Sequence, residues 1–482
     1  MYKKIKIILL VGVGAVLLLV AGAVGYGFWF FKQAALPEGL VSRAVQGITD
    51  DKASAEAFAH SFLGFDRPKT YLILFLNNTE IRPGGGFIGA YAVMTMNRGR
   101  PTLVKLEGTE LLDNSAKRER LPLPPAVLEQ YLKVSRWYFR DSNWSPDFAS
   151  SSAFGLEVYS LEQGTLANKI DSVIGFTPTV MEEFLRLTGP VKFGDLEFNA
   201  TNFTERLEYE VEKGYARKGK TTSERKDIIR ELAKAMISKL KFDIWLNYST
   251  YLRLAKRMLA EKQIVFYSPH PETQAAIEQA NWGGRVKATN GDYLLWADAN
   301  LGALKTDHAI VRSLNYQVFR TTTGFLAQTT MVFEHTQERD WRTSIYRDYA
   351  RVFVPRGSRI LSVSSDQLFS NQRATTTYDF GQESGKTWFG AYFTVDYKSK
   401  RAITFTYILP TSTVWGGAEG KEYDLLVQKQ IGTKAVPLTV ALKFDKAVVA
   451  SRPPANFPGQ KINEYKVATD LSQDRMFNLR VE

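Results

Sequence analysis

The feature that most constrains this chain is an uncharged apolar run of 25 residues, Ile7–Phe31, near its N-terminus. At a rise of about 1.5 Å per residue, such a helix spans a bilayer hydrocarbon core of about 30 Å. Three lysines precede the run and only Lys32 follows closely, so the positive-inside rule places the N-terminus in the cytoplasm. A signal peptide, the alternative, has an apolar core of only about 7–15 residues. We therefore expect a single-pass anchor within residues 1–35 and an extracytoplasmic location for the rest of the chain.

The composition excludes several kinds of chemistry. The 482 residues include no cysteine, which rules out disulfides, thiol nucleophiles, iron–sulfur clusters and cysteine-bound zinc. The four histidines lie far apart and none is in an HExxH pattern, which argues against a histidine metal site or a Ser–His–Asp triad. The net charge is +12, and because the chain is expected outside the cytoplasm, nucleic acid is a poor partner for its basic surface.

The pattern of apolar residues changes near residue 306 and predicts two domains after the anchor. Residues 36–305 alternate helical and strand patterns, which is typical of an α/β fold. Residues 306–450 alternate apolar and polar residues, as at 403–409, and this predicts a β-sandwich. The polar residues 451–482 are expected to form a loosely attached tail. The predicted α/β strands lie at 71–76, 90–96, 102–106, 171–176 and 263–267, and the helices at 149–161 and 178–188 and near 199–212, 223–241 and 247–261.

The densest polar motif, Asn77–Gly89, directly follows the first apolar strand. Its glycines would let backbone amides approach an anion, its arginine would supply a fork of donors for phosphate, and its glutamate would hold a divalent cation such as Mg²⁺. The alternative is a tight glycine turn capped by Asn78, in which Arg82 pairs with Glu80. The residues alone favour neither hypothesis. The predicted site residues of this motif are Asn78, Glu80, Arg82, Gly85 and Gly86.

A second polar cluster occupies residues 140–148, just before a predicted helix. Asp141 and Asp147 offer carboxylate oxygens, which are ligands that magnesium prefers. The alternative is a polar loop in which Ser145 or Asp147 caps the helix. The cluster predicts either a metal-binding and substrate-binding loop or a capping loop.

A third candidate is the basic stretch 213–226, which leads into a predicted helix with Ser223 as a plausible N-cap. Arg225 and Lys226 could reach a polyanion such as a lipid-linked phosphate. The alternative is a solvated charged surface, which is the usual role of a run of charges.

The motif Asn77-Asn78-x-Glu80-x-Arg82-Pro-x-Gly-Gly-Phe-Ile-Gly resembles the hallmark of an uncharacterised bacterial family, the domain of unknown function numbered four-zero-one-two. The resemblance implies a single-pass, surface-facing bacterial protein; the family has no established activity. It covers nearly all of residues 50–450. Further matching motifs lie at 141–148, 171–176, 187–190, 298–305 and 346–355.

The order of these motifs is also similar to that of the LytR–CpsA–Psr phosphotransferases, which move glycopolymers from a polyprenyl-pyrophosphate carrier to the cell wall. This resemblance implies that Glu80, Arg82 and Arg225 hold the pyrophosphate with magnesium. It also aligns the family's Pro-Arg-Asp motif with Glu110-Leu-Leu-Asp113, which keeps the aspartate and lacks the arginine. A missing arginine removes one source of charge stabilisation from the transition state.

Two hypotheses follow for this cell-envelope protein. The first is a magnesium-assisted transferase acting on a polyprenyl-pyrophosphate glycan. The second is a non-catalytic protein that binds envelope glycans or a protein partner. Convergence of the predicted residues would favour the enzyme, and the missing arginine favours binding. The predicted catalytic residues are Arg82, Asp113 and Arg225, the metal ligands Glu80 and Asp141, and the substrate-binding residues Asn78, Gly85, Gly86, Asp147 and Lys226.

Overall fold

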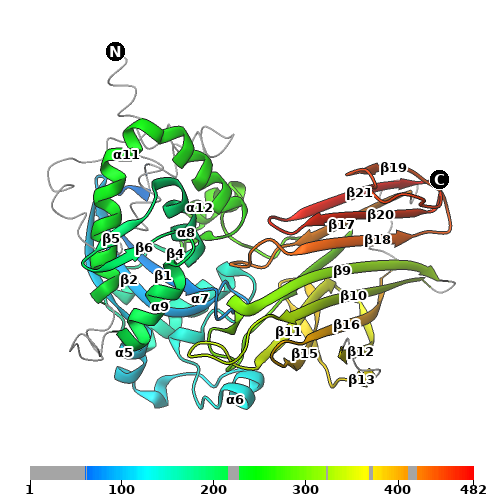
Figure 1. Ribbon diagram of the computed structural model, residues 1–482, viewed down its shortest axis with the longest axis horizontal. Coiled ribbons are helices and arrows are strands. Elements are labelled where there is room, and N and C mark those ends of the chain that lie inside the picture. Colours follow the sequence, from blue (N-terminus) through cyan, green and yellow to red (C-terminus); the bar gives the residue numbers. More distant parts are fainter. Residues whose placement is uncertain (1–59, 61, 215–226, 322–323, 368–372, 411–420) are drawn as a thin grey trace. The chain divides into compact units, whose positions relative to one another are not determined.

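The computed structural model describes residues 60, 62–214, 227–321, 324–367, 373–410 and 421–482. The predicted anchor lies outside these residues, and no helix within them is long and apolar enough to cross a membrane. The chain divides into two compact units, which are coloured by sequence in Figure 1. The first, called the α/β unit, consists of the described residues within Met1–Asn77, Gly85–Pro124 and Ser135–Arg285, and the second, called the two-sheet unit, of those within Asn78–Gly84, Pro125–Val134 and Val286–Glu482.

The α/β unit is built on a five-stranded sheet in the order β3-β2-β1-β4-β7. β1 pairs in parallel with β4, while the other neighbours are antiparallel. The strands are β1 (Lys69–Asn77), β2 (Phe87–Asn97), β3 (Arg100–Gly108), β4 (Ser172–Phe176) and β7 (Ile264–Tyr267), and a small hairpin joins β5 (Val191–Phe193) to β6 (Leu196–Phe198). The α/β architecture predicted from the alternating patterns is confirmed.

Helices cover both faces of this sheet. Tyr71 and Ile73 of β1 pack into a core with side chains of α8, α9 and α11, while Leu72 and Leu74 point to the opposite face, towards α7. This alternation is why β1 is an uninterrupted apolar run, since both of its faces are buried. The helices of this unit are α5 (Thr109–Ser115), α7 (Phe148–Leu161), α8 (Pro178–Thr188), α9 (Phe203–Tyr209), α11 (Asp227–Ala260) and α12 (Pro271–Gln279), with the short turns η1 (Arg118–Arg120), η2 (Phe139–Asp141), η3 (Ala167–Lys169) and η4 (Glu210–Gly214).

The two-sheet unit contains two seven-stranded sheets that share one hydrophobic core. Buried and partly exposed residues alternate along β10, as the period of two predicts. One sheet has the order β13-β12-β16-β10-β9-β18-β20 and the other β14-β15-β11-β8-β17-β21-β19. The elements are α6 (Ala126–Leu132), β8 (Asp292–Ala297), η6 (Thr306–Ala309), β9 (Ile310–Thr321), β10 (Gly324–His335), β11 (Tyr346–Pro355), β12 (Arg359–Gln367), β13 (Arg373–Thr375), β14 (Asp379–Glu383), β15 (Lys386–Val395), β16 (Lys400–Leu409), β17 (Glu422–Gln428), β18 (Pro437–Lys443), β19 (Val448–Arg452), β20 (Glu464–Asp470) and β21 (Arg475–Val481).

The structure corrects two of the predicted boundaries. The loose tail predicted at 451–482 is wrong, because β20 pairs with β18 and β21 pairs with β17. The second unit also begins earlier than the predicted residue 306, since β8 is a central strand of one of its sheets. All six residues of β8 are buried, so this strand lacks the alternation that marks its neighbours.

Candidate functional site

The hallmark turn, Asn78–Gly84, leaves the α/β unit after β1 and is built into the two-sheet unit. The backbone of Ile81 is bonded on both sides: its carbonyl accepts from the Asn300 amide at 3.0 Å, and its own amide donates to Asp307 Oδ2 at 3.0 Å. The Asp307 amide donates to the Thr79 carbonyl at 3.1 Å. The turn is therefore fixed by residues that follow it by more than two hundred positions.

Arg82 is buried at the centre of this turn, with 2% of its surface exposed. Its guanidinium donates to the carbonyl oxygen of Asn300 at 2.5 Å and to Glu80 Oε1 at 3.2 Å. Asn78 donates from its side chain to the Gly432 carbonyl at 2.8 Å. The pairing of Arg82 with Glu80 is the one that the structural alternative required, and these donors are directed at protein oxygens.

Gly85 and Gly86 return the chain to the α/β unit with φ angles of 119° and 141°. Side chains rarely adopt these angles, so the return path itself requires glycine. The Gly86 carbonyl accepts from Asn143 Nδ2 at 2.6 Å, which ties the polar cluster at 140–148 to the glycines. The two glycines thus have a conformational role here whether or not their amides also meet a ligand.

A network of ion pairs and hydrogen bonds adjoins the hallmark turn and includes several residues of the other motifs. Arg312 bonds Asp298 Oδ2 at 2.7 Å and Asp307 Oδ1 at 2.5 Å, and it donates to the Tyr346 hydroxyl at 2.6 Å. Burial and the neighbouring Asp298 carboxylate raise the pKa of Asp348 well above its usual range. The motifs at 80–82, 298–305 and 346–355 therefore meet in one buried network of the two-sheet unit. Sequence reasoning missed this network because no spacing along the chain marks it.

A separate carboxyl pair lies in the α/β unit, where α5 and the end of α7 meet η2. Arg140 Nε is 3.3 Å from Asp113 Oδ2 and 3.6 Å from Asp141 Oδ2. Glu162 Oε1 accepts from the Phe139 amide at 3.0 Å. Burial is the main reason that the pKa of Asp113 is raised to about 8 and that of Glu162 to about 7, and the repulsion of Glu162 raises the former further. The two carboxyls therefore share a proton near neutral pH.

This carboxyl pair is a site that the sequence found only in part. Asp113 and Asp141 were predicted and do lie together, whereas Glu162 was not predicted, because it follows a helix whose residues show no polar motif. Asp113 is 3% exposed and Glu162 is 1% exposed. Arg140 is the most exposed of these side chains, with 30% of its surface accessible. Chemically, the arrangement offers a shared proton beside a guanidinium that could meet an anion.

Asp147 has the capping role that the second hypothesis for its loop predicted. Its Oδ1 accepts from the Ser150 amide at 2.9 Å at the start of α7, and Arg285 Nη1 lies 3.4 Å from the same oxygen. The capping interpretation is confirmed. A role in substrate binding stays a prediction, and it would have to compete with these contacts.

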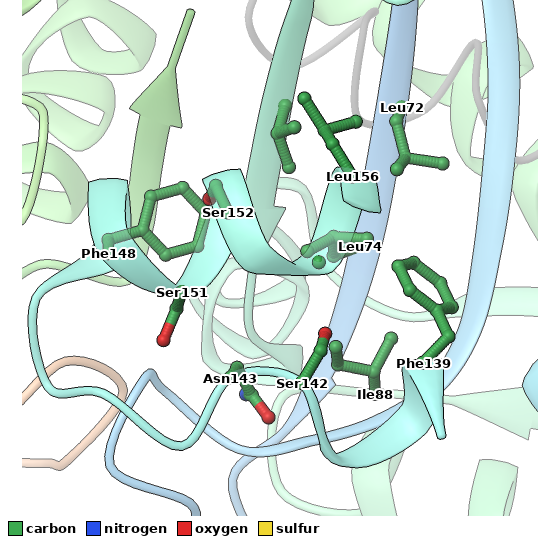
Figure 2. Close-up of a pocket in the computed structure, with 12 residues that line it drawn as sticks. Leu72, Leu74, Ile88, Phe139, Ser142, Asn143, Phe148, Ser151, Ser152 and Leu156 are labelled. Carbon is green, nitrogen blue, oxygen red and sulfur yellow. The ribbon is translucent and has the colours of Figure 1, made fainter. Parts of the chain in front are cut away.

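A small cavity separates α7 from strands β1 and β4 of the α/β unit (Figure 2). It is almost entirely apolar, with Leu72, Leu74 and Leu156 among its lining residues, and residues of the 142–152 segment also line it. Its volume is about 10 Å³, close to the space that a single water molecule needs. Asn143 Oδ1 and Ser152 Oγ are buried there without a hydrogen-bond partner. These two oxygens are the natural positions for a bound water or a small polar group.

The predicted metal ligands do not gather into a site in the part of the chain that the structure describes. Glu80 pairs with Arg82 in the two-sheet unit, and Asp141 lies beside Arg140 in the α/β unit. Within the described residues no group of three His, Asp or Glu side chains is placed to hold a metal ion. A magnesium requirement stays a prediction, and no chemical step is derived from it. Arg225 and Lys226 lie outside the described residues.

The fold and its buried networks define a protein of two interleaved units, one α/β and one with two packed sheets. Residues 66–211 match the model of the family described as protein of unknown function (DUF4012), which confirms the first resemblance over these residues, a smaller part of the chain than the predicted 50–450. No protein with curated information matches the chain. Among solved structures, leukotriene A4 hydrolase from Saccharomyces cerevisiae is similar at 9% identity with a TM-score of 0.22, over 36% of this chain and 29% of that one. The chain thus spans less than a third of that hydrolase, and the likeness carries no argument about function.

Proposed function

We propose that this chain is a membrane-anchored, extracytoplasmic protein of the bacterial cell envelope that binds a lipid-linked glycan or a protein partner without transforming it. The observation that supports binding over catalysis is that Arg82 is buried and hydrogen-bonded to other groups of the protein. Its guanidinium is 2% exposed and donates to Asn300 and Glu80. Turning it towards a diphosphate would leave the Asn300 carbonyl buried without this donor, which costs about 1–3 kcal/mol.

The anchor is part of the proposal and rests on the apolar run at 7–31. It can be tested by labelling, because the natural chain has no cysteine and any introduced thiol is unique. Ile462 is 77% exposed, so Ile462→Cys provides an accessible site in the two-sheet unit. We expect a membrane-impermeant maleimide to label this variant in cells or spheroplasts with an intact cytoplasmic membrane. Labelling only after lysis would contradict the extracytoplasmic location.

A transferase like the LytR–CpsA–Psr enzymes is the second candidate, and the carboxyl pair favours it. Asp113 and Glu162 share a proton beside Arg140, an arrangement that could take a proton from an acceptor hydroxyl while the guanidinium contacts a phosphate. In this candidate the carrier phosphate would be the leaving group and the acceptor oxygen would form the new bond to phosphorus. The α/β unit would then share the fold of those enzymes, with Arg140 in place of the missing arginine.

One experiment separates the two candidates. The full chain in detergent is given a polyprenyl-pyrophosphate-linked oligosaccharide together with cell-wall fragments as the acceptor, with and without magnesium, and both binding and release of the carrier phosphate are measured. Our proposal expects saturable binding of the intact lipid, or no binding if the partner is a protein, and no release in either case. Release that is lost in Arg140→Gln and kept in Arg100→Gln, an exposed arginine of the same unit, would establish the transferase.

A further inference from the structure

A short basic segment of the α/β unit, Lys117–Leu123, combines exposed charge with an exposed apolar side chain. Lys117, Arg118 and Arg120 are all exposed, and among the described residues none of them forms an ion pair. With Glu119 as the one acidic residue, the segment has a net charge of 3 − 1 = +2. Such a charge, concentrated in a few residues, is complementary to an anionic surface.

Leu123 is displayed by the same segment with 71% of its surface exposed. Pro122 and Pro124 on either side of it have fixed φ angles, and Pro124 also restricts the backbone of Leu123 to extended conformations. Leu121, at 4% exposed, anchors the segment in the unit, and the Trp137 amide donates to the Pro122 carbonyl at 2.9 Å. The leucine is therefore held outward by a well-anchored backbone.

The segment next to it in space adds a further positive charge. Because the Trp137 amide bonds to Pro122, the preceding residue, Arg136, lies close to the basic segment. Arg136 is partly exposed and forms no ion pair within the described residues. Three exposed basic side chains within six residues of a projecting leucine, with a fourth nearby, are complementary to an anionic bilayer surface: the charges meet head groups, and the leucine enters the boundary with the acyl chains.

We infer that Lys117–Leu123 docks the α/β unit onto the anionic surface of the membrane in which the chain is anchored. The inference rests on the anchor of the proposed function, since the tether at 7–31 keeps the segment within reach of the bilayer. Docking holds the unit against the lipid head groups, where a lipid-linked ligand would be presented to it. The interaction is electrostatic and interfacial, so it weakens as salt is added.

The test uses the full chain with the single thiol Leu123→Cys, labelled with an environment-sensitive dye, in nanodiscs. We expect a blue shift of the dye in phosphatidylglycerol–phosphatidylcholine nanodiscs, no shift in pure phosphatidylcholine, and reversal at high salt. Each basic side chain near such a surface contributes about fivefold, so Arg118→Gln with Arg120→Gln should lower the ratio of docked to undocked chains about 25-fold. The dye at Ile462→Cys is the matched control and should not respond to lipid charge.

The possible results of this experiment distinguish failure of the docking hypothesis from failure of the anchor hypothesis. A chain that stays in the nanodiscs after a high-salt wash but shows the same dye spectrum in both lipids refutes docking and leaves the anchor intact. A chain that fails to incorporate refutes the anchor, and binding of the labelled chain to vesicles of the same two compositions then decides the docking. A shift that appears only when soluble polyphosphate is added identifies a polyanion as the partner and refutes the bilayer. Hydrogen exchange of residues 117–124 in the unlabelled chain gives a second readout, with slower exchange expected only in anionic nanodiscs.

Discussion

Replacing Arg82 by methionine tests whether the hallmark arginine holds the fold or holds a ligand. Methionine keeps much of the length of the side chain and removes the charge and the donors. The lost bond to the buried Asn300 carbonyl has a charged donor, and such bonds contribute about 1.5–3 kcal/mol. The lost pair with Glu80 adds less than a fully buried pair would, because 20% of the Glu80 side chain is exposed. We therefore expect the two-sheet unit to lose about 3 kcal/mol of unfolding free energy.

The loss is measured by calorimetry and by denaturant unfolding of the full chain. For a unit of this size, about 3 kcal/mol corresponds to a fall in Tm of about 6–12 °C. Arg356→Met is the control, since Arg356 is an exposed arginine of the same unit, and its change should stay within about 0.5 kcal/mol. If Arg82→Met were as stable as this control, the arginine would not be structural, and the anion-binding hypothesis for the turn would regain its support.

Three further predictions concern the α/β unit. The folded-state pKa values of Asp113 and Glu162, about 8 and about 7, lie above those of unfolded chains, so the folded state binds more protons. The contribution of the pair to stability therefore falls as pH rises from about 4 to about 8. Asp113→Asn should flatten this loss in unfolding measured as a function of pH, and an unchanged pH profile would contradict the shared proton. Asp147→Ala should destabilise α7 by about 1 kcal/mol in thermal unfolding, with Asp147→Asn, which keeps a capping oxygen, losing less. Gly86→Ala should cost about 1 kcal/mol or more because of its φ of 141°, and an equally stable variant would show that the return path can change.

Local signals predicted the elements whose ends and faces are set by adjacent residues. Thr177-Pro178 and Gly189 predicted a helix, and α8 runs from Pro178 to Thr188 with Gly189 at a positive φ of 77° at its end. The period of two at 403–409 predicted β16. These signals act within a few residues, so a single sequence contains them.

The role of the hallmark turn could not be predicted in the same way. Whether the donors of Arg82 meet a phosphate or a carbonyl depends on Asn300, which is 218 positions away in the chain. The same holds for β8, which is buried among neighbouring strands that come later in the sequence and therefore shows no alternation. The carboxyl pair is an intermediate case. The resemblance indicated Asp113, but Glu162 lies next to it only because the fold brings the end of α7 close to α5.

The passage of the hallmark turn into the two-sheet unit has a consequence for how this protein can be divided. The backbone crosses between the units at five points, after residues 77, 84, 124, 134 and 285, so no single cut separates them. A fragment limited to the family-matched residues 66–211 would carry Arg82 without Asn300, Asp307 or Gln430, the residues to which the turn is bonded. The two units are therefore inherited together: a recombination event that exchanged the segments of the α/β unit for foreign ones would also replace the turn between them, which is bonded within the two-sheet unit.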